Sequence, residues 1–294
     1  LSASGDTKRP LGYLTAAGIL NVILNLFFVI VCKMAADGVA LASIISQYLS
    51  AVLVLLHMTR LTDSCRVEWK LLRLHGSEVG RILGLGVPAG IQHMIFAVAN
   101  LFIQVGINSF DSTVVSGNSA AVNVDNVIYN VMAAFYTACS TFMGQNWGAG
   151  KKDRMMKSYY ISLGYSFAIA AVLGAAFLLC GEPFLYIFTN DADVVAAGME
   201  RMRIMCFSYC VSAFMDCTIA ACRGLGRSFV PTVIVIMGSC VFRVIWVYTV
   251  FAYFHSIPSL YLLYAFSWTI TSLAEIIYFA ACWRKMKNKK TAPI

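Results

Sequence analysis

The stretch FMGQNWGAGKKDRMMK, residues 142–157, lies between two long apolar segments and combines a glycine-rich turn with basic residues. A phosphate-binding P-loop requires the pattern GxxxxGK followed by Ser or Thr, placed between a strand and a helix. Here Gln145 stands where the first glycine is needed, and Lys152 follows Lys151. The pattern therefore predicts no nucleotide site. We interpret the stretch as a tight turn between two helices, because glycine closes helices in left-handed conformations.

The composition predicts an all-α polytopic membrane protein. The chain is 60% hydrophobic and 12% charged, with a mean hydropathy of +0.75, whereas soluble domains have about 25% charged residues. Its apolar runs reach the roughly 18 residues needed to span a bilayer as a helix, while a barrel strand needs only about 9–11. We predict eight spans, at residues 12–33, 38–58, 82–108, 119–143, 158–180, 196–222, 230–254 and 259–282.

The charge distribution sets an expected orientation. Most of the 22 Lys and Arg residues fall before the first span, in alternate connections such as 151–157, and after the last span. The other connections are nearly free of them and include Glu182, Asp191 and Asp193. The positive-inside rule then places both termini in the cytoplasm. We expect the plasma membrane as the location. The net charge of +8 does not indicate nucleic acid, since it is distributed in this alternating way.

The cysteines and histidines give no pattern for a metal, cofactor or enzyme. The ten cysteines fall mostly inside apolar spans, without CxxC or His-paired spacing. Cysteine commonly packs as a small buried hydrophobe. No HExxH motif or comparable cluster of acid, base and nucleophile occurs. We expect neither a metal nor an organic cofactor, and no catalytic residues.

A weak internal repeat indicates two equivalent halves. ASGDTKRP, residues 3–10, resembles GLGRSFVP, residues 224–231, so that Gly5 aligns with Gly226 and Pro10 with Pro231. Each segment precedes two predicted spans. If each half has six spans and ends with this pair, four spans would precede Leu1, and we expect the sequence to be a fragment. Two such halves are an architecture of secondary transporters.

Several motifs, in order along the whole chain, resemble the multidrug and toxic compound extrusion (MATE) family. They are GVPAGIQHMIFAVANLFIQVGINSF (86–110), FMGQNWGAGKKDRMMK (142–157) and CRGLGRSFVP (222–231), together with SGDTKRP (4–10), NVILN (21–25) and GVALASIISQ (38–47). The resemblance implies twelve helices in two six-helix lobes, of which this chain would be the C-terminal two-thirds. It also implies alternating access and the export of organic cations in exchange for Na⁺ or H⁺.

The resemblance divides the chain into four parts. Residues 1–58 would be the last two helices of the N-lobe, and 59–80 the cytoplasmic linker between lobes. Residues 81–285 would be the six-helix C-lobe, followed by a basic cytoplasmic tail at 286–294.

Among the ionisable side chains inside the predicted spans, four are worth weighing: Asp125, Asp216, Arg243 and Glu275. Such groups are costly at membrane depth unless paired or hydrated, so they are candidates for function. Asp216 is the first candidate for contact with the coupling ion or a cationic substrate; the alternative is a fixed ion pair with Arg243. Some sodium-coupled members of the family carry an acid about one turn earlier, where this sequence has Ser212. Residues four apart share a helical face.

The other three ionisable groups have different expected roles. Asp125 either takes part in binding or orients its polar span near the outer surface. Arg243 is expected to be the structural partner of a carboxylate, because the implied cargo is cationic. For Glu275 we expect a side chain that extends to the cytoplasmic surface or pairs with Arg284 or Lys285.

Amide side chains form a polar face on the span 82–108. Gln92, Asn100, Gln104 and Asn108 fall at or near four-residue steps. Such a stripe either lines a water-filled cavity or bonds to neighbouring helices; we favour the cavity. His93, beside the stripe, is expected to be a packing residue.

Asn21 and Asn25 lie one turn apart in the first span and complete the set of candidate ion- or substrate-binding residues. Proton-coupled members of the family often have Asp where Asn25 stands, and asparagine cannot titrate. Sodium-coupled members commonly place Glu on the span 82–108, which has none here. Na⁺ and H⁺ therefore both remain possible coupling ions.

Three alternatives compete with the exporter. A flippase for lipid-linked precursors shares the two-bundle architecture but would need a strongly basic cavity, and within the spans only Arg243 lies deep. A membrane-embedded enzyme would need the clusters that the sequence lacks. The third is that the fragment alone does not transport. The oligomeric state and the physiological cargo have no signature in the sequence.

Overall fold

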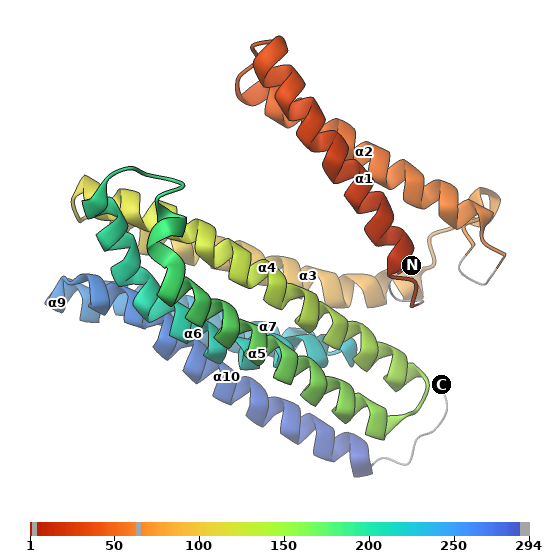
Figure 1. Ribbon diagram of the computed structural model, residues 1–294. Helices are drawn as coiled ribbons and strands as arrows, with labels where there is room; N and C mark the ends of the chain where they lie inside the picture. Colours follow the sequence, from red (N-terminus) through yellow and green to blue (C-terminus); the bar gives the residue numbers. More distant parts are fainter. Residues whose placement is uncertain (2–4, 63–65, 289–294) are drawn as a thin grey trace. The chain divides into compact units, whose positions relative to one another are not determined.

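The computed structural model describes residues 1, 5–62 and 66–288, which form long helices joined by turns and loops (Figure 1). The chain divides into two compact units, Leu1–Gly76 and Ser77–Ile294. Part of the predicted basic tail, residues 289–294, lies outside the described residues, as do Ala3 and Ser4 of the proposed repeat.

The first unit is a pair of helices. α1 (Lys8–Leu26) continues through a π-helical turn, η2 (Phe27–Val31), and α2 (Ala36–Arg60) packs along it. Asn21 donates a hydrogen bond from Nδ2 to Ser46 Oγ over 3.2 Å, and Asn25 donates to Asn21 Oδ1 over 3.0 Å. These amides therefore join α1 to α2, the second of the two roles that polar groups take in membrane helices. A short 3₁₀ turn, η3 (Trp69–Leu71), follows.

The second unit contains the remaining long helices. They are α3 (Gly76–Ile107), α4 (Ser112–Gly148), α5 (Lys152–Leu185), α6 (Ala192–Gly224) and α10 (Ile257–Asn288), with a segmented helix over Phe229–Phe254 between α6 and α10. All eight predicted spans are present as helices, each longer than its apolar run. Among the described helices, seven are long and apolar enough to cross a membrane. α4 falls below that hydropathy because Asn123, Asp125, Asn126 and Asn130 interrupt it.

The segmented helix alternates between α- and π-helical turns. Its parts are α7 (Phe229–Val235), η4 (Ile236–Val241), α8 (Phe242–Trp246), η5 (Val247–Phe251) and α9 (Ala252–Phe254). Wide π turns within helices often occur at functional sites. Arg243 lies in α8, between the two wide turns.

α6 is the central helix of this unit, with α4, α5 and α10 packed around it (Figure 1). About two-thirds of its membrane-length window, 67%, is buried. Glycines bring α4 and α6 close at both ends: a Cβ on Gly117 would lie 2.8 Å from Gly198 N, and one on Gly224 would lie 2.5 Å from Ser140 O. Small residues that allow backbones to approach are the usual means of packing helices in lipid.

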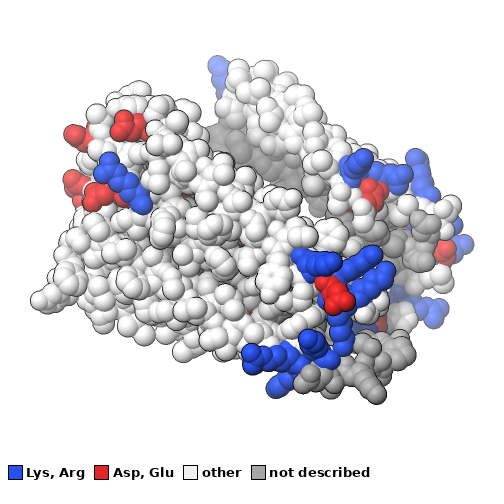
Figure 2. Space-filling view, turned by 60° about the horizontal axis from the view of Figure 1, so that its bottom comes forward, with Lys and Arg blue, Asp and Glu red and all other residues white. Residues whose placement is uncertain are grey.

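The turn after α4 has the predicted form. α4 ends at Gly148, α5 begins at Lys152, and Gly150 adopts φ +68°, in the left-handed region. The aligned glycines of the internal repeat also share a conformation, with φ +94° at Gly5 and +75° at Gly226. Figure 2 shows Lys and Arg side chains in a dense group at one end of this unit and a mainly acidic group at the other end.

Candidate functional site

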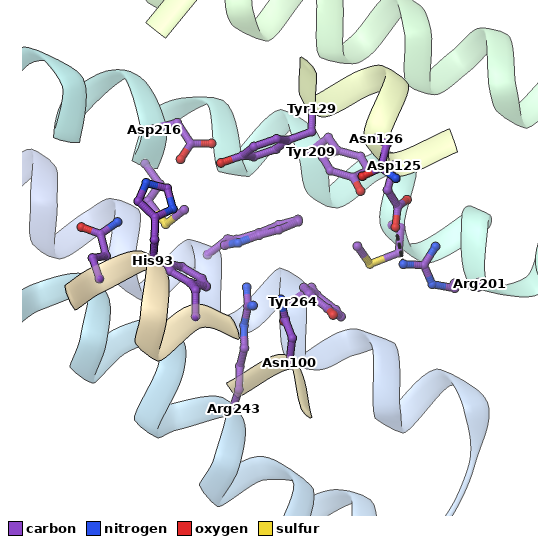
Figure 3. A pocket seen from close by; sticks show the side chains of 15 residues that line it. His93, Asn100, Asp125, Asn126, Tyr129, Arg201, Tyr209, Asp216, Arg243 and Tyr264 are labelled. Carbon is purple, nitrogen blue, oxygen red and sulfur yellow. Dashed lines mark hydrogen bonds and ion pairs between the residues drawn. The ribbon is translucent and has the colours of Figure 1, made fainter. Parts of the chain in front are cut away.

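A cavity of about 310 Å³ lies inside the second unit (Figure 3). Its walls come from α3, α4, α6, α8 and α10, so helices far apart in sequence contribute side chains to one space. The lining residues are Gln92, His93, Phe96, Asn100, Asp125, Asn126, Tyr129, Arg201, Met205, Tyr209, Met215, Asp216, Arg243, Tyr264 and Trp268.

An ion pair closes one side of the cavity. Arg201 of α6 donates from Nη2 to Asp125 Oδ2 of α4. The Arg201 side chain is 4% exposed and that of Asp125 16%, and the guanidinium also lies 5.3 Å from the ring centroid of Tyr261. Asp125 thus has a fixed partner, and the pair joins two helices of the wall. We did not predict Arg201 as part of the site.

Arg243 does not form the predicted ion pair with a carboxylate anywhere in the described part of the chain. Instead its guanidinium lies 4.5 Å from the ring centroid of Tyr264, 5.5 Å from that of Phe96 and 5.6 Å from that of Trp268. Its Nε donates to Ser267 Oγ over 3.1 Å. Aromatic faces attract cations by their quadrupoles, so these rings take the place of the missing carboxylate.

Asp216 is the carboxylate of the cavity that has no ion-pair partner among the described residues. Its Oδ2 is buried and has no hydrogen-bond partner there, and the side chain lies on the cavity wall. In Figure 3 the ring of Tyr129 points its hydroxyl toward Asp216. The positive charges of Arg223 and Arg243 act on this carboxylate without contacting it. The alternative of a fixed Asp216–Arg243 pair is therefore not what the structure shows.

The predicted amide stripe of α3 divides into two parts. Gln92 and Asn100 line the cavity, whereas Gln104 and Asn108 do not; Gln104 donates from Nε2 to Asn108 Oδ1 over 2.8 Å. Gln92 Oε1 accepts from Arg223 Nη2 over 2.9 Å and so ties α3 to the end of α6. His93 was expected to be a packing residue, but its exposed side chain lines the cavity.

Glu275 behaves differently from the prediction. We expected it to reach the cytoplasmic surface or to pair with Arg284 or Lys285. It is fully buried, at 0% exposure, and neither carboxylate oxygen has a hydrogen-bond partner among the described residues. The positive charge that acts on it is that of Arg223. Its position on α10, facing α6 rather than lipid, explains the difference.

Several cavity residues were missed by the sequence reasoning, although a signal for some existed. Arg201, Met205, Tyr209 and Asp216 line the same cavity from α6, at the spacing of one helical face. This spacing could have predicted that Arg201 lies on the same face of α6 as Asp216. The aromatic residues Tyr129, Tyr264 and Trp268 carried no such signal, because aromatic side chains are common in any membrane helix.

The described residues contain no group of three or more His, Cys, Asp or Glu side chains that could hold a metal ion. Of the cysteines described, six are buried: Cys139, Cys206, Cys217, Cys222, Cys240 and Cys282. They pack within the helix bundle.

Comparison with known families identifies the chain. The MatE family model matches residues 88–249, a span that includes α4, α5 and α6 and most of the cavity wall. The chain belongs to the MatE family. It is thus a multi-pass membrane protein with an all-helical transporter fold, as its resemblance to MATE proteins implied.

Relatives and solved structures agree with this membership. The chain is 28% identical over 210 residues to the Probable multidrug resistance protein YpnP of Bacillus subtilis, covering 71% of this chain and 46% of that protein. It is 23% identical over 202 residues to the FAD transporter of Shewanella oneidensis, covering 66% and 44%. The crystal structure of a MATE protein in the bent conformation superposes with a TM-score of 0.85 at 16% identity, covering 96% of this chain and 63% of that one. The chain therefore spans about half the length of the curated relatives that it matches.

Proposed function

We propose that this chain forms part of a secondary active exporter. The exporter would move cationic or amphipathic small molecules by alternating access, in exchange for Na⁺ or H⁺. The observation that carries the proposal is the Asp216 carboxylate, which lies on the wall of an internal cavity with a buried oxygen that has no partner among the described residues. The MatE membership and the named multidrug resistance relative support the class of activity.

The chemistry of the cavity suits an exchangeable cation. The negative charge of Asp125 is already neutralised by Arg201, so Asp216 is the carboxylate left to attract a cation. Tyr129 and Tyr209 add aromatic surface beside it, and aromatic faces favour organic cations. A coupling ion and a cationic cargo would compete for the same carboxylate as access alternates, which is a basis for antiport.

The distribution of charge supports a cytoplasmic location for both termini, and we propose the plasma membrane as the location of the exporter. The turn after α4 has four basic residues within 151–157, and basic connections are retained in the cytoplasm. The eight spans predicted from the sequence, an even number, are consistent with termini on one side of the membrane.

The test measures efflux from cells or proteoliposomes made with the complete gene that encodes this chain. Ethidium efflux is followed under imposed Na⁺ or H⁺ gradients for wild type, Asp216→Asn and Glu182→Gln, an exposed carboxylate outside the cavity. We expect Asp216→Asn to abolish the gradient-driven component and Glu182→Gln to retain it. Unchanged gradient-driven efflux in Asp216→Asn would refute the role of Asp216.

A second candidate is a transporter of anionic or zwitterionic cargo, such as a lipid-linked precursor flippase. The observation that favours it is Arg243, whose Nη2 has no hydrogen-bond partner among the described residues and which lines the same cavity. The FAD transporter relative is consistent with this candidate. In the same assay, a protein that moves an anionic dye and depends on Arg243 rather than Asp216 would favour the second candidate. Reconstituting the 294-residue chain alone tests whether these helices suffice for transport.

A further inference from the structure

A basic hollow of about 790 Å³ lies between the start of α5 and the end of α10, at the opposite end of α5 from Glu182. Five cationic side chains and one anionic side chain surround it. They are Lys151, Lys152, Arg154, Lys157 and Lys287 against Asp153, together with Gly150, Met156 and Trp283. The hollow shares no residue with the cavity that contains Asp216. A cationic cargo would be repelled here, whereas an anionic ligand would be attracted.

An apolar groove lies beside this hollow and is lined mainly by residues of the same two helices, with Phe214 of α6. It encloses about 350 Å³ and is lined mainly by apolar and aromatic side chains, including Tyr160, Leu163 and Phe279. Met156 and Trp283 belong to both spaces. The basic hollow and the apolar groove therefore lie next to each other, on either side of Met156 and Trp283.

Side-chain contacts hold α5 and α10 together beside the hollow and the groove. The rings of Tyr159 and Phe279 pack with their centroids 4.8 Å apart. Near the end of α10, Lys152 Nζ donates to the backbone oxygen of Met286 over 2.9 Å. The two helices are thus held together on both sides of the point where the hollow meets the groove.

We propose that the hollow and the groove together bind an anionic membrane phospholipid, with its phosphate among the basic side chains and an acyl chain in the groove. Arg154 and the lysines would supply charge-assisted hydrogen bonds to the phosphate oxygens. Basic pockets between membrane helices on the cytoplasmic side are suited to anionic headgroups. Trp283 lies where the polar and apolar compartments meet, which is the depth that Trp prefers in a bilayer.

The start of α5 adds to this electrostatic complementarity. Its N-cap residue, Lys151, makes no side-chain capping bond. The charged residues of its first turns are basic, at Lys152, Arg154 and Lys157, except for Asp153. The positive end of a helix dipole disfavours cations and favours anions. A headgroup phosphate would relieve the repulsion among these charges, whereas a free phosphate ion would leave the adjoining apolar groove unused.

Native mass spectrometry of the purified chain in detergent tests the proposal. The probes are phosphatidylglycerol, phosphatidylcholine and inorganic phosphate. Arg154→Gln/Lys157→Gln is compared with Lys70→Gln/Arg73→Gln, which removes the same charge from an exposed segment of the first unit. We expect phosphatidylglycerol to bind in preference to phosphatidylcholine. Two positive charges near an anionic headgroup contribute roughly thirtyfold to the affinity. Arg154→Gln/Lys157→Gln should therefore bind phosphatidylglycerol roughly thirtyfold more weakly than wild type, and Lys70→Gln/Arg73→Gln should bind it as wild type does.

A separate variant tests the groove. Ala280→Trp, at an exposed position on its wall, should weaken phosphatidylglycerol binding while leaving the basic side chains intact. Equal affinity of wild type and Arg154→Gln/Lys157→Gln for phosphatidylglycerol would overturn the proposal. So would equal binding of the two lipids. If inorganic phosphate binds with the same affinity as phosphatidylglycerol, and Ala280→Trp does not change that affinity, the hollow is a site for free anions instead. None of these results depends on transport.

Discussion

Arg201 and Asp125, 76 positions apart in sequence, form an ion pair that joins α6 to α4 at the wall of the cavity. Both side chains are largely buried. Removing one partner of such a pair leaves an uncompensated charge, which typically costs about 3–5 kcal/mol. We therefore expect Asp125→Asn to lower the free energy of unfolding by about 3 kcal/mol, measured by equilibrium unfolding in mixed detergent micelles.

The double variant Asp125→Asn/Arg201→Gln distinguishes this loss from a general weakening of the helices. Because it removes both charges, it should recover part of the stability lost in Asp125→Asn. Glu78→Gln is the matched control: Glu78 pairs with Arg81 over 3.7 Å at an exposed position, and exposed pairs contribute about 0–1 kcal/mol. Equal losses in Asp125→Asn and Glu78→Gln would contradict the prediction.

The long helices could be predicted from the sequence because lipid leaves the backbone few alternatives, and apolar runs of sufficient length are unambiguous. The turn at Gly150 could be predicted because glycine closes helices in left-handed conformations. The roles of Arg243 and Glu275 did not follow, because a sequence shows that a charge is inside the membrane but not what faces it. Arg243 is matched by aromatic rings and Glu275 is turned toward α6. Both depend on the rotation of each helix about its own axis.

The glycine contacts between α4 and α6 predict a sharp sensitivity to added methyl groups. A Cβ on Gly224 would lie 2.5 Å from Ser140 O and 2.7 Å from Met143 Cβ, and one on Gly117 would lie 2.7 Å from Val194 O. Backbone atoms cannot move aside as a flexible side chain can. We expect Gly117→Ala and Gly224→Ala each to lower the free energy of unfolding by about 1–3 kcal/mol, the usual effect of overpacking.

Gly164 of α5 provides the control for these substitutions. A Cβ at this position would meet no atom within 4 Å. Alanine favours helix over glycine by up to about 1 kcal/mol, so Gly164→Ala should keep or raise the stability. If all three alanine variants shift the unfolding midpoint alike, the close approach of α4 and α6 does not determine their stability.

The surroundings of Arg243 predict that arginine stabilises the protein more than lysine does at this position. The guanidinium faces three aromatic rings and bonds Ser267 through Nε. Lysine retains the charge but cannot stack its ammonium as a planar group. We expect Arg243→Lys to lower the free energy of unfolding by about 2 kcal/mol, since an aromatic contact of a desolvated cation is worth about that much. Unfolding in mixed micelles measures it, and a lysine variant as stable as wild type would exclude a role for stacking.

Glu275 predicts that removing a charged residue stabilises the protein. Its side chain is fully buried, and both carboxylate oxygens are without a hydrogen-bond partner among the described residues. A buried polar group left unsatisfied costs about 1–3 kcal/mol, and replacing it by an apolar group of similar size removes that cost. Arg223, whose charge acts on Glu275, keeps its hydrogen bond to Gln92. We expect Glu275→Leu to raise the free energy of unfolding by about 1–2 kcal/mol, with Glu275→Gln near wild type. A Glu275→Leu variant less stable than Glu275→Gln would instead mean that the carboxylate has a favourable partner, and a bound cation would be the first to test.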